Sequence, residues 1–184
     1  MYLKNHRNEK PTNPKATVVL SLLLFAAAVI LDQVTKHLAV TGLKEKPAKV
    51  LIDGVFELRY LENRGAAFGM MQDMQFVFVI GAAVILIAAA IWFVRAPFTT
   101  AYVPLRVCAV LLCAGAVGNL IDRVRLDYVV DFFYFSLIDF PIFNVADCYV
   151  VAAVALFAVL ILFFYGDDEK PAKEKALEGH DEEE

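Results

Sequence analysis

Apolar residues gather in four long runs along this chain, and polar segments separate the runs. The runs cover residues 16–31, 76–94, 103–121 and 142–165. The first continues as a helical pattern to about residue 40, which brings it close to the ~20 residues that a helix needs to cross a bilayer. The pattern therefore predicts an all-α membrane protein with four transmembrane helices.

Two connecting segments carry patterns of their own. Phe56, Leu58 and Tyr60 alternate with charged side chains. This period of two predicts a strand over residues 55–62, with an apolar face on the bilayer surface. Residues 123–141 are rich in phenylalanine and tyrosine. Such rings suit a membrane interface, where they either form an aromatic belt or hold an apolar substrate.

The two ends of the chain are charged and fall outside the apolar runs. Residues 1–15 are basic and contain two prolines, and residues 166–184 are acidic. We predict two solvated tails around a single membrane domain at residues 16–165. The positive-inside rule places both tails in the cytoplasm, so the ends of the first and third helices and the start of the fourth meet at the outer face.

Composition narrows the class of protein and of chemistry. With 184 residues, 60% of them apolar, and a mean hydropathy of +0.61, the chain is suited to one compact membrane domain. The three histidines lie outside the runs and the three cysteines lack C-x-x-C spacing, so we expect no metal site and no cofactor. Only two serines are present, which argues against a Ser-His hydrolase.

Carboxylates stand at the ends of two runs, where burial in a membrane is expensive. The third run ends near Asn119 and Asp122, and the fourth begins with Asn144 and Asp147. Insertion scales put a charge at a helix centre at about 2.5–3.5 kcal/mol, which favours a functional role. Asp147 has an ordinary alternative as a helix cap with Asn144. Asp122 lies at a helix C-terminus, where the dipole disfavours an anion, and has no such alternative.

We interpret Asp122 and Asp147 as a pair of carboxylates that meets at the outer face. Asp147 at a helix N-terminus is expected to be ionised and Asp122 to hold the proton. Such a pair can activate water against an amide carbonyl without a covalent intermediate. Asp32 and Lys36 share a helix face, so they form either an ion pair or a further part of the site.

The polar residues fall into five short motifs. These are Asp32-Gln33-x-x-Lys36, Asn63-x-Gly65-Ala66-Ala67-Phe68, Gly118-Asn119-x-x-Asp122-Arg123, Val130-Asp131-Phe132 and Phe143-Asn144-x-Ala146-Asp147. In order and spacing they resemble bacterial lipoprotein signal peptidase, the signal peptidase II family, over residues 16–165. The resemblance implies an intramembrane aspartyl protease with four helices and a small outward-facing β-cradle. Its substrates would be prolipoproteins with a diacylglyceryl-modified cysteine, cut on the N-terminal side of that cysteine.

The resemblance also implies residue roles and partners. Asp122 and Asp147 match the catalytic dyad of the family. Polar and small residues that match its surroundings are Asn63, Gly65, Asn119, Arg123, Asp131, Asn144, Asp32 and Lys36. The family acts in the bacterial cytoplasmic membrane and is inhibited by globomycin-type cyclic peptides. We further expect a monomer whose partners are prolipoproteins and membrane lipids, with no nucleic acid.

Two other classes of protein remain as alternatives. In a proton-coupled transporter or channel subunit, Asp122 and Asp147 would relay protons. That class is disfavoured because the polar residues lie toward one face and the halves of the chain show no inverted repeat. In a structural membrane subunit, Asn144 and Asp147 would be caps only, which leaves Asp122 unexplained.

Overall fold

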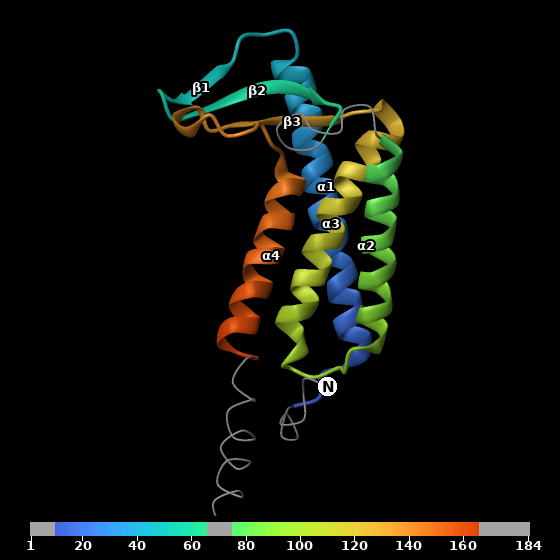
Figure 1. Cartoon of the computed structure of the whole chain (residues 1–184). Helices are drawn as coiled ribbons and strands as arrows, with labels where there is room; N and C mark the ends of the chain where they lie inside the picture. The colour runs from blue at the N-terminus through green and yellow to red at the C-terminus, as the bar shows by residue number, and fades with distance from the viewer. Residues whose placement is uncertain (1–9, 66–74, 166–184) are drawn as a thin grey trace, which may run out of the picture.

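The computed structural model describes residues 10–65 and 75–165, which form a helical bundle with a small antiparallel sheet at one end (Figure 1). The helices are α1 (Pro14–Leu43), α2 (Gln75–Arg95), α3 (Tyr102–Leu126) and α4 (Val145–Phe163). The strands are β1 (Lys49–Ile52), β2 (Phe56–Asn63) and β3 (Val129–Tyr134), and a 3-10 turn, η2, covers Ser136–Ile138. All four helices are long and apolar enough to cross a membrane, which confirms the predicted fold class.

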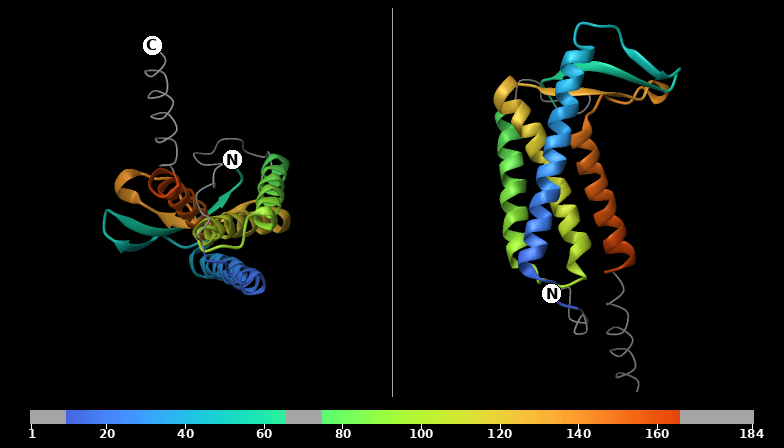
Figure 2. Two further views of the ribbon diagram at one scale, coloured as in Figure 1. Left: turned by 90° about the horizontal axis from the view of Figure 1, so that it is seen from below. Right: turned by 180° about the vertical axis from the view of Figure 1, so that it is seen from behind.

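Helix α3 is the central helix and packs against α1, α2 and α4 (Figures 1 and 2). Small residues allow this packing. A Cβ atom on Gly115 would lie 2.5 Å from the carbonyl oxygen of Ala146, so α3 and α4 approach closely there. Ala114, Ala146 and Ala153 are buried. Close approach at small residues is the usual way in which helices associate in lipid.

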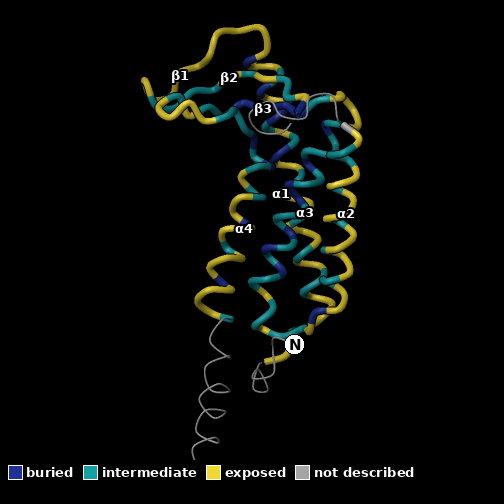
Figure 3. Tube along the Cα trace, in the orientation of Figure 1, coloured by how far each residue is buried: buried dark blue, intermediate teal, exposed yellow. Residues whose placement is uncertain are grey.

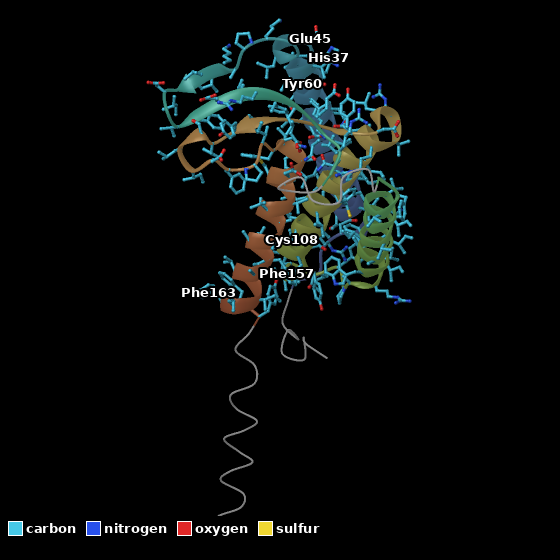
Figure 4. All side chains as sticks on the ribbon, turned by 45° about the horizontal axis from the view of Figure 1, so that its top comes forward. His37, Glu45, Tyr60, Cys108, Phe157 and Phe163 are labelled. Carbon is cyan, nitrogen blue, oxygen red and sulfur yellow. The ribbon has the colours of Figure 1, made fainter. Side chains whose placement is uncertain are left out.

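Exposed residues predominate on the outside of the bundle (Figure 3), and many of them are large and apolar. Leu22, Ile80 and Phe163 are each more than half exposed, at 62%, 58% and 71%. Figure 4 shows Phe157 and Phe163 on the part of α4 far from the sheet, and both are exposed. Water would solvate such a continuous apolar surface poorly, whereas the hydrocarbon of a bilayer matches it.

The sheet has the strand order β1-β2-β3 and lies across the end of the bundle where α1 and α3 terminate (Figure 1). The strand predicted at residues 55–62 is present as β2. The flanking strands β1 and β3 were not predicted. Every residue of β1 is exposed and the first four residues of β3 are buried, so neither strand alternates between two environments. Without that alternation the period of two is absent from the sequence.

The sheet is attached to the bundle through the last turns of α1. Ala39 and Leu43 of α1 form a buried cluster with Val130 and Phe132 of β3. Helix α1 accordingly continues to Leu43, beyond the predicted end near residue 40. The cluster holds β3 directly above the ends of the helices.

Helix α4 starts later than predicted, at Val145 rather than residue 142. The reason is that Phe143 pairs with β3: its carbonyl oxygen accepts a bond of 2.8 Å from the Phe133 amide, and its own amide donates back at 3.0 Å. Residues just before the helix therefore extend the sheet. This pairing brings the start of α4 next to β3.

Candidate active site

Polar side chains converge between the sheet and the adjoining ends of α1, α3 and α4. Asp32, Asp131 and Asn144 are almost completely buried, with 0–1% of their surface exposed. Buried polar groups are stable only when they are hydrogen-bonded. The bonds they make divide into two neighbouring clusters, one around Asp147 and Asp131 and one around Asp122.

The first turn of α4 forms a capping box. The Asn144 side chain accepts from the Asp147 amide at 3.0 Å, and Asp147 Oδ2 accepts from the Asn144 amide at 3.1 Å. The predicted cap is confirmed, and the positive end of the helix dipole favours an anion at Asp147. The Asp147 side chain also lines a cavity, so it is accessible from that cavity as well as being part of the helix cap.

Asp131 projects from β3 and is held by two amide groups. Asn63 Nδ2 donates to Asp131 Oδ2 at 2.8 Å, and Asn144 Nδ2 donates to Asp131 Oδ1 at 2.6 Å. Asn63 pairs with Val129 in the β2–β3 register, and this pairing brings its side chain within reach of Asp131. Burial, and next the negative charge of Asp147, raise the pKa of Asp131 to about 7.

Asn119 on α3 completes this cluster. Its Nδ2 donates to Asp147 Oδ1 at 2.8 Å, and its Oδ1 accepts from Asn144 Nδ2 at 3.1 Å. Asn144 thus bonds to Asp131, Asn119 and the Asp147 backbone at once. Asn144 therefore holds the two carboxylates in a fixed relation, because its side chain donates to Asp131 and its backbone amide donates to Asp147.

Asp122 belongs to the second cluster, below β3. Its Oδ2 lies 3.0 Å from Lys36 Nζ and accepts from the Val130 amide at 3.1 Å, while its Oδ1 accepts from Gln33 Nε2 at 3.1 Å. Only 4% of its surface is exposed. The cation and the backbone amide account for the anion at a helix C-terminus that the sequence left unexplained.

Asp32 and Lys36 form the predicted ion pair, with Lys36 Nζ 3.1 Å from Asp32 Oδ2. Asp32 Oδ1 also accepts from the Ala146 amide at 2.9 Å, which ties α1 to the first turn of α4. Lys36 Nζ donates to Asn119 Oδ1 at 2.9 Å. The ammonium group therefore orients the amide that binds Asp147, and the second cluster supports the first.

A cavity of about 1250 Å³ opens beside the first cluster. Asp131 and Asp147 both line it, whereas Asp122, Asp32 and Lys36 do not. Its other polar or charged lining residues include Asn63, Asn119, Arg123 and Arg64, and its apolar walls include Phe78, Tyr134, Phe140, Ile142, Phe143, Val150 and Val151.

The geometry changes the expected pairing of carboxylates. Asp122 was expected to face Asp147, but its oxygens point to Lys36, Gln33 and the backbone of β3. The fully buried carboxylate that lines the cavity together with Asp147 is Asp131, which the resemblance places among the supporting residues. Asp131 belongs to one of the sequence motifs, but strand β3 was not predicted. The position of Asp131 next to the start of α4 could therefore not be predicted either.

Arg123 reaches the cavity from the last turns of α3. Its Nη2 contacts the Gly65 carbonyl at 3.5 Å, and its guanidinium lies 4.5 Å from the centre of the Phe78 ring. Its buried Nε has no hydrogen-bond partner among the described residues. Arg123 thus supplies positive charge at the cavity wall. The rest of the Gly65 motif, residues 66–68, lies outside the described residues.

Gln33, which belongs to the first motif, also contributes to the second cluster, a role that the sequence did not predict. Its Nε2 donates to Asp32 Oδ2, Asp122 Oδ1 and the Gly118 carbonyl, each at 3.1 Å. In the sequence, the only feature that could have indicated this role is the position of the Gln33 amide next to Asp32 and Lys36, which are spaced i, i+4. Within residues 10–65 and 75–165, no three His, Cys, Asp or Glu side chains are grouped so as to hold a metal ion.

Residues 24–163 match the family described as Signal peptidase (SPase) II, and this range contains every residue of both clusters. A lipoprotein signal peptidase of Clostridioides difficile is 38% identical over 146 residues, which cover 79% of this chain and 97% of that protein. A lipoprotein signal peptidase of Streptococcus pyogenes is 38% identical over 148 residues, which cover 80% of this chain and 93% of that protein.

Solved structures resemble the fold as well. One, described as a bacterial membrane enzyme at 2.3 Å resolution, superposes with a TM-score of 0.75 at 32% identity and covers 88% of this chain and 96% of its own. A second bacterial membrane enzyme, at 1.9 Å resolution, gives a TM-score of 0.71 at 35% identity and covers 80% and 95%.

Proposed function

Because the chain belongs to the signal peptidase II family, we propose that it removes signal peptides from bacterial prolipoproteins by hydrolysis at a pair of carboxylates, Asp131 and Asp147. The observation that carries the choice of pair is that both line the same cavity and both bond to Asn144. Asp122, the residue expected from the family motif, is proposed instead to be structural. Its ion pair with Lys36 holds α1, α3 and β3 together.

The proposed substrate carries a diacylglyceryl group on the cysteine that follows the cleaved bond. The cavity supports this choice because it combines a polar end with apolar walls. Val151 lines the cavity and is also 67% exposed on α4, so the cavity reaches the lipid-facing surface of the bundle. A lipid-anchored substrate then enters sideways, with its acyl chains in the bilayer and its peptide bond at the carboxylates.

In the proposed reaction Asp147 is the base and Asp131 is the acid. Ionised Asp147 takes a proton from water as the water oxygen attacks the amide carbon, and protonated Asp131 gives its proton to the carbonyl oxygen. The tetrahedral intermediate then collapses: Asp147 protonates the departing nitrogen and Asp131 takes back a proton. The products are the carboxyl end of the signal peptide and the free amine of the lipidated cysteine.

The neighbouring polar groups position these two carboxylates. Asn119 and Asn144 hold Asp147, and Asn63 and Asn144 hold Asp131. Arg123 is proposed to bind a carbonyl of the substrate, because its charge lies at the cavity wall and its Nε is unpartnered within the described residues.

Location and partners follow as further parts of the proposal. The sheet and the cavity face the outer side of the cytoplasmic membrane, and both tails, at residues 1–15 and 166–184, lie in the cytoplasm. The membrane domain at residues 16–165 acts as a monomer. Cyclic peptides of the globomycin type are expected to inhibit by occupying the cavity beside Asp131 and Asp147.

The test is cleavage of a diacylglyceryl-modified prolipoprotein by purified wild type and by three isosteric variants. Asp131→Asn and Asp147→Asn are expected to fold and to lose about 10²–10⁴-fold in rate, the usual contribution of a general acid or base. Asp122→Asn is the matched control. It is expected to lose about 1.5–3 kcal/mol of stability, because a hydrogen bond to a charged group is lost, while its folded fraction still cleaves.

Two results would decide against this pair. If folded Asp131→Asn cleaves at the wild-type rate while folded Asp122→Asn does not, the pair is Asp122 and Asp147, as the sequence suggested. If wild type fails to cut beside the lipidated cysteine, the peptidase proposal itself is wrong.

A further inference from the structure

A second hollow lies between α1 and α3, at the end of the bundle away from the sheet. Its volume is about 430 Å³. The two helices cross, as Figure 2 shows, and the hollow lies along their N-terminal halves. Toward the middle of the bundle it is lined by Leu20, Leu24, Val107 and Val110. Ser21 of α1 also lines this part of the hollow, which is therefore a mainly apolar groove that follows the helix axes.

The other end of the groove is polar. Thr12, Asn13 and Thr17 line it, and no Asp or Glu is among the described residues of its wall. The segment before α1 closes this end, because the Thr12 amide donates to the Phe98 carbonyl in the α2–α3 connection at 2.9 Å. The groove thus has a fixed polar end followed by an apolar stretch. This arrangement matches an amphiphile, in which a polar headgroup is joined to an apolar chain.

A buried cation, Arg106, stands in the wall of the polar half. Only 2% of its surface is exposed. Its Nη1 donates to the Phe93 carbonyl at 2.9 Å and its Nη2 to the Ala96 and Pro97 carbonyls at 2.8 and 3.3 Å, while its Nε has no partner among the described residues. None of the ion pairs within residues 10–65 and 75–165 includes Arg106. Carbonyls at the end of α2 orient the guanidinium, and no carboxylate in the described part of the chain neutralises it.

We propose that this groove binds one anionic phospholipid. Its phosphate lies at the polar end, attracted by the positive charge of Arg106, which forms none of the described ion pairs, and bonded by the side chains of Asn13 and Thr17. One acyl chain follows the apolar groove. Exposed Lys10 and Lys15 at the same end of the bundle add to the attraction. Basic pockets between transmembrane helices are the usual sites for anionic headgroups. The proposal does not depend on the peptidase activity.

The test begins with the full chain, purified in a neutral detergent and delipidated. Native mass spectrometry compares retention of phosphatidylglycerol with that of phosphatidylcholine of the same acyl chains. We expect phosphatidylglycerol to be retained at least about fivefold better, the preference that one headgroup-facing cation confers. In a third arm of the experiment, the melting temperature of the delipidated protein is measured with inorganic phosphate and with phosphatidylglycerol. Inorganic phosphate is expected not to raise the melting temperature, because the acyl chain is needed to fill the groove.

Two tryptophan variants of neighbouring residues locate the site. Ser21→Trp fills the groove and leaves the bonds of Arg106 untouched, so it is expected to abolish retention of phosphatidylglycerol. Leu22→Trp adds the same ring on the outside of α1, where Leu22 is 62% exposed, and is expected to bind as wild type does. Arg106→Gln is expected to bind both lipids equally.

Several outcomes would overturn the proposal. These are equal retention of the two lipids by wild type, unchanged retention by Ser21→Trp, and stabilisation by phosphate equal to that by phosphatidylglycerol. A dimer mass for wild type that Ser21→Trp converts to a monomer would assign the groove to a second copy of this chain instead.

Discussion

Asp122 and Asp131 lie on consecutive elements, and their surroundings give them different properties. Asp122 is bonded to a cation, Lys36, and to a backbone amide. Asp131 receives hydrogen bonds from the neutral amides of Asn63 and Asn144, and none of the described ion pairs includes it. A buried carboxylate without a bonded cation holds its proton more tightly. Asp131 is therefore suited to exchange a proton near neutral pH.

The free energy of unfolding should depend on pH because Asp131 holds this proton. Burial and the charge of Asp147 raise the pKa of Asp131 to about 7 from 3.8, so between these values the folded protein holds a proton that the unfolded chain releases. The contribution of Asp131 to the free energy of unfolding therefore decreases as pH rises across this window. Asp131→Asn cannot ionise, so its melting temperature should rise relative to wild type between about pH 5 and pH 8.

The exposed Asp53→Asn is the control, and its melting temperature should follow that of wild type at both pH values. Cleavage by wild type should decrease above about pH 7, as Asp131 loses the proton that the proposed mechanism requires. A melting-temperature difference between Asp131→Asn and wild type that does not change with pH would contradict this account of Asp131.

At the level of elements, helix α3 determines how closely the bundle packs. Gly115 faces α4, and Gly118 faces Asp32 on α1: added Cβ atoms would lie 2.5 Å from the Ala146 carbonyl and from Asp32 Oδ2, respectively. The glycines therefore bring together the helices that carry the two clusters. Gly81 on α2 faces open space, with no atom within 4 Å of such a Cβ.

These contacts predict opposite effects for the same substitution. Gly115→Ala is expected to lose about 1–3 kcal/mol of stability, because the added carbon overpacks the α3–α4 contact. Gly81→Ala is expected to be neutral or stabilising, since alanine is the better helix former. Thermal unfolding in one detergent measures both. Equal melting temperatures for the two variants would show that the bundle relaxes around Gly115.

At the level of the whole molecule, the buried carboxylates and the sheet lie at one end and the N-terminal segment at the other (Figure 1). Lys4, Arg7, Lys10 and Lys15 all precede or begin the first transmembrane helix. The sheet end also carries Lys and Arg, but the basic flank of the first helix usually dominates the orientation and stays in the cytoplasm. We infer that the cavity faces outward.

Cysteine labelling tests this orientation. Lys49→Cys on β1 and Thr100→Cys in the α2–α3 connection are both exposed, and exposed Cys148 is replaced by alanine in each. A membrane-impermeant maleimide added to intact spheroplasts is expected to label Lys49→Cys at once and Thr100→Cys only after lysis. The reverse order of labelling would invert the proposed topology.

The sequence by itself determined the helical membrane fold, strand β2, the cap at Asn144 and Asp147, the ion pair of Asp32 with Lys36, and the family. Each of these depends on residues close together in the chain or on a motif, so a linear pattern records it. Strands β1 and β3 left no such record, because each lies in one uniform environment. Only the tertiary structure shows that the buried carboxylate of Asp131, and not that of Asp122, shares the cavity with Asp147. That arrangement depends on β3 folding back over α3, which directs Asp131 into the cavity and leaves Asp122 with Lys36.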